Sequence, residues 1–61
     1  MRKREDIIDA AERLFYSNGF HATSTDRICS EAGVSTRTFY RYFPSREALT
    51  EAVMDARQRR F

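Results

Sequence analysis

The chain has 61 residues, enough for one domain and too few to enclose a substrate-sized pocket. Eleven basic and nine acidic residues give a net charge of +2, which does not identify a partner. With Cys29 as the single cysteine there is no disulfide framework, which fits a reducing cytoplasm. No apolar run approaches the length of a signal peptide or a membrane span, so neither secretion nor membrane insertion is expected.

The first segment predicts an amphipathic helix over about residues 4–18. Apolar residues recur there at helical spacing, and Asn18-Gly19 supplies a stop signal. The apolar positions are Ile7, Ile8, Ala11, Leu14 and Phe15.

Two shorter helices are predicted next, over about residues 25–32 and 36–43. Ser24 and Ser35 stand at their N-cap positions, where a hydroxyl can accept from an unpaired amide of the first turn. Gly33 is expected to end the earlier helix, because glycine readily adopts the left-handed conformation.

A fourth helix is predicted over about residues 46–60. Pro44 disfavours helical geometry in the residue before it and so separates this helix from the third. Ser45 is the expected N-cap. One apolar stripe runs along the helix and consists of Leu49, Ala52, Val53 and Ala56.

The turn between the second and third helices has the composition of a helix-turn-helix. Gly33 is followed by a small apolar residue and a capping serine, which leaves three or four residues for the turn. In that motif the second helix enters the major groove of DNA, although other helical hairpins also use a glycine turn. With no strand pattern, we expect an all-α fold: a three-helix, homeodomain-like helix-turn-helix bundle followed by the start of a fourth helix.

The third helix carries basic residues without acidic ones, since residues 32–46 contain no carboxylate. Arg37 and Arg41 are four residues apart, so their repulsion costs a few tenths of a kcal/mol in a helix. An external anion would relieve it. Phe39 and Phe43 share another face of the helix and are predicted to be buried.

Residues 23–49, TSTDRICSEAGVSTRTFYRYFPSREAL, resemble the DNA-binding domain of the tetracycline-repressor (TetR) family of bacterial transcriptional regulators. The resemblance extends over about residues 4–53 and includes many positions at fixed spacing. These are Gly19-Phe20, Thr23-Ser24, Ala32-Gly33-Val34-Ser35, Thr38-Phe39-Tyr40, Phe43, Ser45-Arg46-Glu47 and Leu49.

This resemblance implies sequence-specific binding of double-stranded DNA by the operator-reading domain of a transcriptional repressor. It also implies that the full-length parent is a homodimer on a palindromic operator, each domain binding a half-site. The family has a C-terminal helical domain for effector binding and dimerisation, so a small-molecule effector would act only through that domain. We interpret residues 1–61 as the DNA-binding domain without it.

Three positions depart from the family pattern. Arg27 stands where an acid is usual, Cys29 where a smaller residue is usual, and Arg37 where glycine or alanine is frequent. The last change places a long side chain capable of base reading where many relatives have none.

The resemblance implies contacts with base edges by Thr36, Arg37 and Tyr40. An arginine can bind guanine O6 and N7 in bidentate fashion. The alternatives for Arg37 are a solvated side chain or a phosphate contact.

A second set is similar to the family's phosphate-binding residues, which set the register of the protein on DNA without reading sequence. For Arg46 the alternative is a surface ion pair. This set consists of Thr25, Thr38, Arg41, Tyr42 and Arg46.

The basic residues Arg2, Lys3 and Arg4 form a possible arm that follows the DNA backbone or enters a minor groove. A solvated terminus is the alternative.

We expect no enzymatic activity, cofactor or metal, since the sequence shows no nucleophile-base pair, ligand cluster or phosphate-cradling glycine loop. A cytoplasmic regulator without membrane contact is expected instead. The competing hypothesis is a helical protein-interaction module that binds an acidic partner through the same basic and aromatic face. It predicts that an acidic peptide, and not DNA, would shift the amide resonances of residues 35–46.

Overall fold

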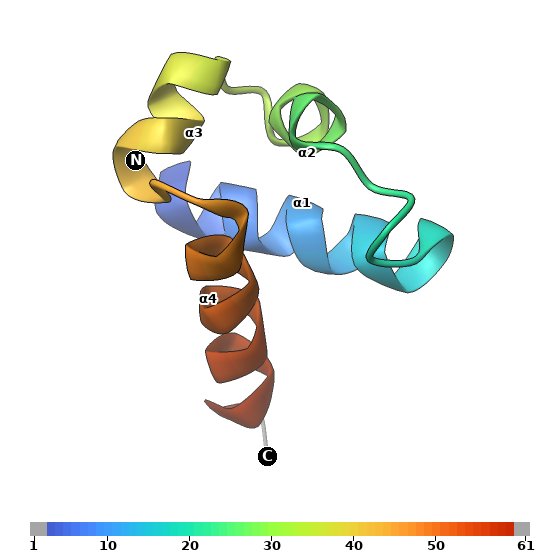
Figure 1. Ribbon diagram of the computed structural model, residues 1–61. Coiled ribbons are helices and arrows are strands. Elements are labelled where there is room, and N and C mark those ends of the chain that lie inside the picture. Colours follow the sequence, from blue (N-terminus) through green and yellow to red (C-terminus); the bar gives the residue numbers. More distant parts are fainter. Residues whose placement is uncertain (1–2, 60–61) are drawn as a thin grey trace.

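The computed structural model describes residues 3–59, and this part of the chain contains four helices and no strand. The helices are α1 (Lys3–Asn18), α2 (Thr25–Ala32), α3 (Thr36–Tyr42) and α4 (Arg46–Arg59). As Figure 1 shows, α2 and α3 lie on one side of α1, and α4 runs crosswise to α1. The predicted all-α helix-turn-helix bundle with the start of a fourth helix is confirmed. No helix between residues 3 and 59 has the length and apolarity that a membrane crossing requires.

The core lies where α1 meets the other three helices. Ile7, Ile28, Phe39 and Leu49 come one from each helix, and each is 0% exposed. Burying a side chain of this size contributes about 1.5–3 kcal/mol. This small cluster is therefore the main source of stability for the domain and fixes the rotation of each helix about its axis.

Several apolar positions predicted for the helix stripes lie at the edge of the core and are only half-buried. Phe15 is half-buried because it stands in the last turn of α1, where its ring packs against the ring of Phe20 with centroids 5.0 Å apart. The other three positions are occupied by alanines, namely Ala32, Ala52 and Ala56.

The connector from α1 to α2, residues 19–24, is held by Thr23. This side chain is 1% exposed, and its hydroxyl donates to the carbonyl oxygens of Leu14 and Gly19 at 3.3 and 2.9 Å. Gly19 has a φ of 89°, a left-handed conformation that favours glycine. The polar group of Thr23 is thereby satisfied inside the fold, and the connector is tied to the end of α1.

The predicted helix caps are confirmed. Ser24, Ser35 and Ser45 each accept a hydrogen bond from the amide three residues further on, at 3.1–3.2 Å. Gly33 follows α2 with a φ of 74°, and its amide donates to the carbonyl oxygens of the last helical turn. The turn between α2 and α3 is therefore fixed by local chemistry, which sets the direction of α3.

α3 ends at Tyr42, one residue earlier than residue 43, the end expected from the sequence. Phe43 is extended, with φ −131° and ψ 96°, because Pro44 excludes helical geometry from the residue before it. The amide of Phe43 still donates to the carbonyl oxygen of Phe39 at 2.8 Å. Residue 60, the expected end of α4, lies outside the described residues.

Candidate nucleic-acid interface

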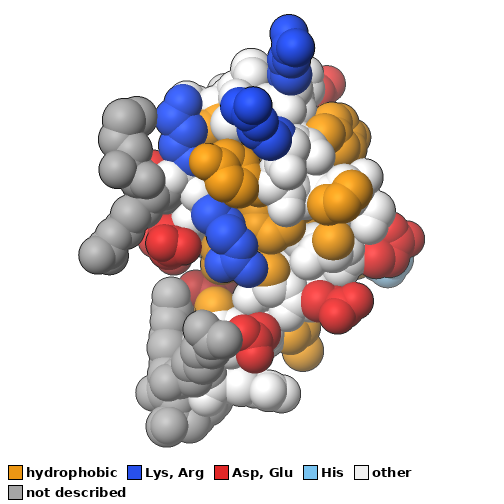
Figure 2. Space-filling view, turned by 90° about the vertical axis from the view of Figure 1, so that its left-hand side faces the viewer, with side chains coloured by type: hydrophobic (Ala, Val, Ile, Leu, Met, Phe, Trp, Pro, Cys, Tyr) orange, Lys and Arg blue, Asp and Glu red, His pale blue; other side chains and the backbone are white. Residues whose placement is uncertain are grey.

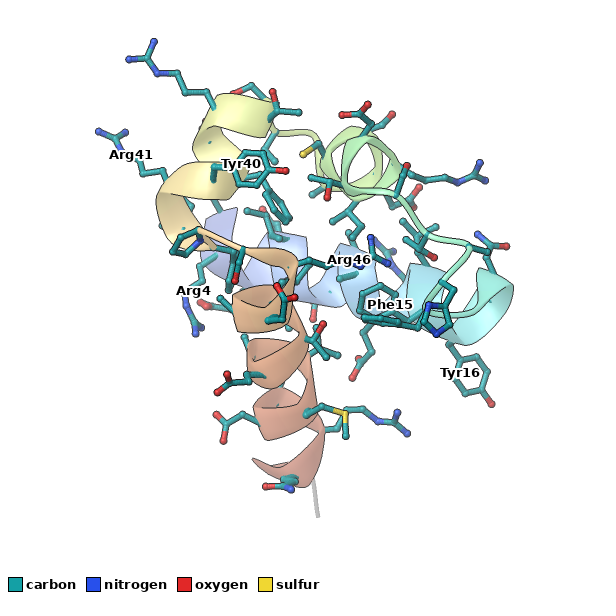
Figure 3. All side chains as sticks on the ribbon, viewed as in Figure 1. Arg4, Phe15, Tyr16, Tyr40, Arg41 and Arg46 are labelled. Atoms are coloured by element: carbon teal, nitrogen blue, oxygen red, sulfur yellow. The ribbon has the colours of Figure 1, made fainter. Side chains whose placement is uncertain are left out.

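One face of α3 is buried and the opposite face is open to solvent. Phe39 is 0% exposed, whereas Thr36, Arg37, Tyr40 and Arg41 are all exposed. Because successive residues of a helix turn by about 100°, the burial of Phe39 forces these other side chains outward. The predicted separation of apolar and basic faces is confirmed. In Figure 3, Arg41 and Tyr40 project from opposite sides of α3, with Tyr40 on the side nearer α2.

The exposed face of α3 is basic and lacks acidic neighbours along the chain. α3 contains no acidic residue, and among residues 3–59 neither Arg37 nor Arg41 has an ion-pair partner. Among the described residues, the ion pairs Arg4–Glu5 and Arg13–Glu31 join partly exposed side chains. The positive charge of α3 is thus available to an anion from outside the domain.

The hydroxyl groups of the predicted phosphate set lie at the two helix starts and along α3. Thr25 is the first residue of α2 and is half-buried. The hydroxyl of Thr38 accepts from Ser35 Oγ at 3.1 Å, so it belongs to the cap of α3. Tyr42 is 42% exposed at the end of α3, next to Arg41. α3 therefore brings Thr38, Arg41 and Tyr42 together, and Thr25 contributes from α2.

Arg46 makes contacts that neither interpretation of the sequence included. Its guanidinium carbon lies 4.7 Å from the ring centroid of Phe20 and 5.7 Å from that of Phe15. Its Nη2 also donates to the carbonyl oxygen of Phe20. Figure 3 shows Arg46 extending toward Phe15, on the other side of the molecule from Arg41. These long-range contacts gave no signal in the sequence pattern.

Two residues of the predicted basic arm, Lys3 and Arg4, are the first two residues of α1, and Arg2 lies outside the described residues. The guanidinium carbon of Arg4 is 5.6 Å from the ring centroid of Phe43, which connects the start of α1 with the end of α3. Arg4 and Arg41 lie on the left-hand side of Figure 3, and Figure 2 shows Lys and Arg side chains gathered on this face around apolar ones.

Cys29 is 4% exposed and packs in the core. Burial raises the pKa of its thiol above the ordinary value of 9.0, and the negative charge of Asp26 adds to the effect. The thiol is therefore protonated and unreactive near neutral pH.

Among residues 3–59, no group of three His, Cys, Asp or Glu side chains is placed to hold a metal ion.

Two helices joined by a short glycine turn, with a basic exposed face on the second, define a helix-turn-helix protein. Residues 7–53 match the family described as bacterial regulatory proteins, tetR family. The chain belongs to this family, and it carries the DNA-binding helix-turn-helix domain of a transcription regulator.

Curated relatives are themselves described as regulators. The HTH-type transcriptional regulator UidR of Escherichia coli K12 is 41% identical over 51 residues, which cover 84% of this chain and 26% of the relative. The uncharacterized HTH-type transcriptional regulator YerO of Bacillus subtilis is 49% identical over 47 residues, covering 77% of this chain and 16% of the relative. An uncharacterized HTH-type transcriptional regulator of Mycobacterium tuberculosis is 46% identical over 54 residues, which cover 88% of this chain and 27% of the relative.

The chain thus spans about a quarter or less of the length of the relatives it matches. No solved structure shows a significant match to it.

Proposed function

We propose that this domain reads operator DNA with α3 in the major groove, as part of a TetR-like transcriptional repressor. The observation that supports the proposal best is the exposed basic face of α3, which is fixed by the burial of Phe39 and has no acidic partner within residues 3–59. The major groove of B-DNA is wide enough to admit one α-helix.

Base reading falls to Thr36, Arg37 and Tyr40, which stand on the exposed face of α3. Arg37 lies in the first turn, where recognition helices approach base edges, and its guanidinium matches the two acceptors of guanine. Tyr40 is 51% exposed and can place its ring against a thymine methyl group.

Phosphate contacts come from Arg41 and from the hydroxyl groups of Thr25, Thr38 and Tyr42. Three of these residues lie on α3, and Thr25 stands at the start of α2, so the set can contact phosphates beside the groove that α3 enters. The amide groups at the start of α2 add to this attraction, because a helix N-terminus favours an anion. Lys3 and Arg4, the first two residues of α1, extend the basic surface toward the DNA backbone.

For the full-length parent we propose a homodimer on a palindromic operator in the bacterial cytoplasm. Its two recognition helices would enter successive major grooves about 34–36 Å apart, or a multiple of that distance. A C-terminal domain would supply the dimer contact and hold a small-molecule effector. The resemblance to the family supports this arrangement.

The proposal predicts weak, strongly salt-dependent binding of the isolated domain to duplex DNA. If Arg41, Lys3 and Arg4 each neutralise a phosphate, a plot of the logarithm of the association constant against the logarithm of the salt concentration should have a slope of about −3. A fluorescence anisotropy titration of a labelled duplex at several salt concentrations measures this slope. An acidic peptide of equal charge is the control, and a domain that binds the peptide while ignoring DNA would refute the proposal.

A further inference from the structure

Arg46 connects the start of α4 with the connector between α1 and α2, a contact that is not one of the main helix–helix contacts. The principal contacts are those of α1 with α2, α1 with α4, and α2 with α3. Arg46, the first residue of α4, reaches the connector through the ring and the carbonyl oxygen of Phe20. It therefore couples the start of α4 with the segment that leads into α2.

The connector is held from both sides. On the inside, the buried hydroxyl of Thr23 is bonded to carbonyl oxygens of Leu14 and Gly19. On the outside, the Phe20 ring packs against Phe15, and Arg46 covers both rings. The carbonyl oxygen of Phe20 accepts from Arg46 and also from the amide of Thr23 at 3.4 Å.

Given the proposed function, we propose that Arg46 is a positioning residue for DNA binding rather than a phosphate contact. By fixing Phe20, it fixes the connector and hence the start of α2, where Ser24 caps the helix and Thr25 is placed to meet a phosphate. The position of Thr25 relative to α3 then depends on the Arg46–Phe20 contact.

Lysine cannot reproduce this contact. A guanidinium group is planar, so it can lie over a ring while an in-plane N–H donates to a carbonyl oxygen. An ammonium group keeps the charge and could still reach a phosphate, but it does not stack in this way. Arg46→Lys therefore separates a positioning role from a phosphate contact.

The experiment compares Arg46→Lys and Arg46→Gln with Arg41→Lys and Arg41→Gln by duplex titration over a series of salt concentrations. All proteins are measured at a temperature at which circular dichroism shows them to be folded. We expect both Arg46 variants to bind about fivefold more weakly, with the salt slope of the unchanged protein. Arg41→Gln should instead make the negative salt slope shallower by about 0.9, because one phosphate is no longer neutralised, and Arg41→Lys should leave the slope unchanged.

A second measurement uses the DNA-free proteins. In an amide correlation spectrum, both Arg46 variants should shift the resonances of residues 19–25, and the Arg41 variants should leave them in place. The inference is overturned if Arg46→Lys binds like the unchanged protein while the negative salt slope of Arg46→Gln is shallower by about 0.9, as expected for a lost phosphate contact. It is also overturned if the folded Arg46 variants bind with unchanged affinity, which would mean that Arg46 only stabilises the fold. Failure of the unchanged protein to bind any duplex would instead refute the proposed function.

Discussion

Replacing Phe39 by alanine is expected to remove a large part of the free energy that stabilises the folded domain. Phe39 is 0% exposed and contacts the rings of Phe43 and Tyr40, at centroid distances of 6.0 and 5.1 Å. Truncating a buried phenylalanine costs about 3–5 kcal/mol, because the lost transfer free energy is increased by the cavity left behind. A domain of 61 residues has only about 3–9 kcal/mol of stability in total.

Thermal and urea denaturation followed by circular dichroism measures this loss. Tyr40→Ala is the matched control, because the neighbouring side chain is 51% exposed and its removal should leave the helical signal and a cooperative transition intact. The same Tyr40 variant should nevertheless lose affinity for DNA. A Phe39→Ala protein with a midpoint close to that of the unchanged protein would contradict the structural basis of the interface.

Replacing Arg37 by alanine is expected to relax the preference for one base pair of the operator. A bidentate arginine–guanine pair contributes about 1–3 kcal/mol of discrimination, which is about 5- to 150-fold in relative affinity. Affinity for sequences that already lack this guanine should change much less. The preferred sequence is first found by selecting bound oligonucleotides from a random pool with a dimerised version of the domain. Competition titrations with single-base variants then measure the preference.

Arg41→Ala is the comparison for this prediction. It should weaken binding to every duplex by a similar factor, because a phosphate contact carries no sequence information. It should also make the negative salt slope shallower by about 0.9, because one phosphate is no longer neutralised. If Arg37→Ala also weakens binding equally on every sequence, Arg37 contacts phosphate or only adds positive charge, and its assignment to base reading is wrong.

The sequence predicted the parts of the fold that depend on local chemistry. Ser24 and Ser35 cap helices through hydrogen bonds to amides three residues away, and Gly33 ends α2 through its own backbone conformation. The burial of Phe39 followed from helical spacing, which also places Arg37 outward. These features need only a short stretch of chain to be recognised.

Features that depend on distant parts of the chain were not predictable in the same way. Arg46 meets Phe20 across 26 positions of sequence, and nothing in the spacing of α4 indicates that contact. Thr23 is a polar residue in a connector, and its burial depends on the fold bringing the end of α1 alongside it. Phe15 fits the apolar stripe of α1 but stands in the last turn of the helix, at the edge of the core, and its ring is half-buried.

The most direct test of the account is a chemical-shift map of the domain titrated with duplex DNA. The exposed side of α3 and the start of α2 should show the largest changes, especially Arg37, Tyr40 and Arg41, and the second half of α4 should change little. A map in which these residues stay unchanged with DNA but move with an acidic peptide would contradict the account and assign the basic face of α3 to a protein partner.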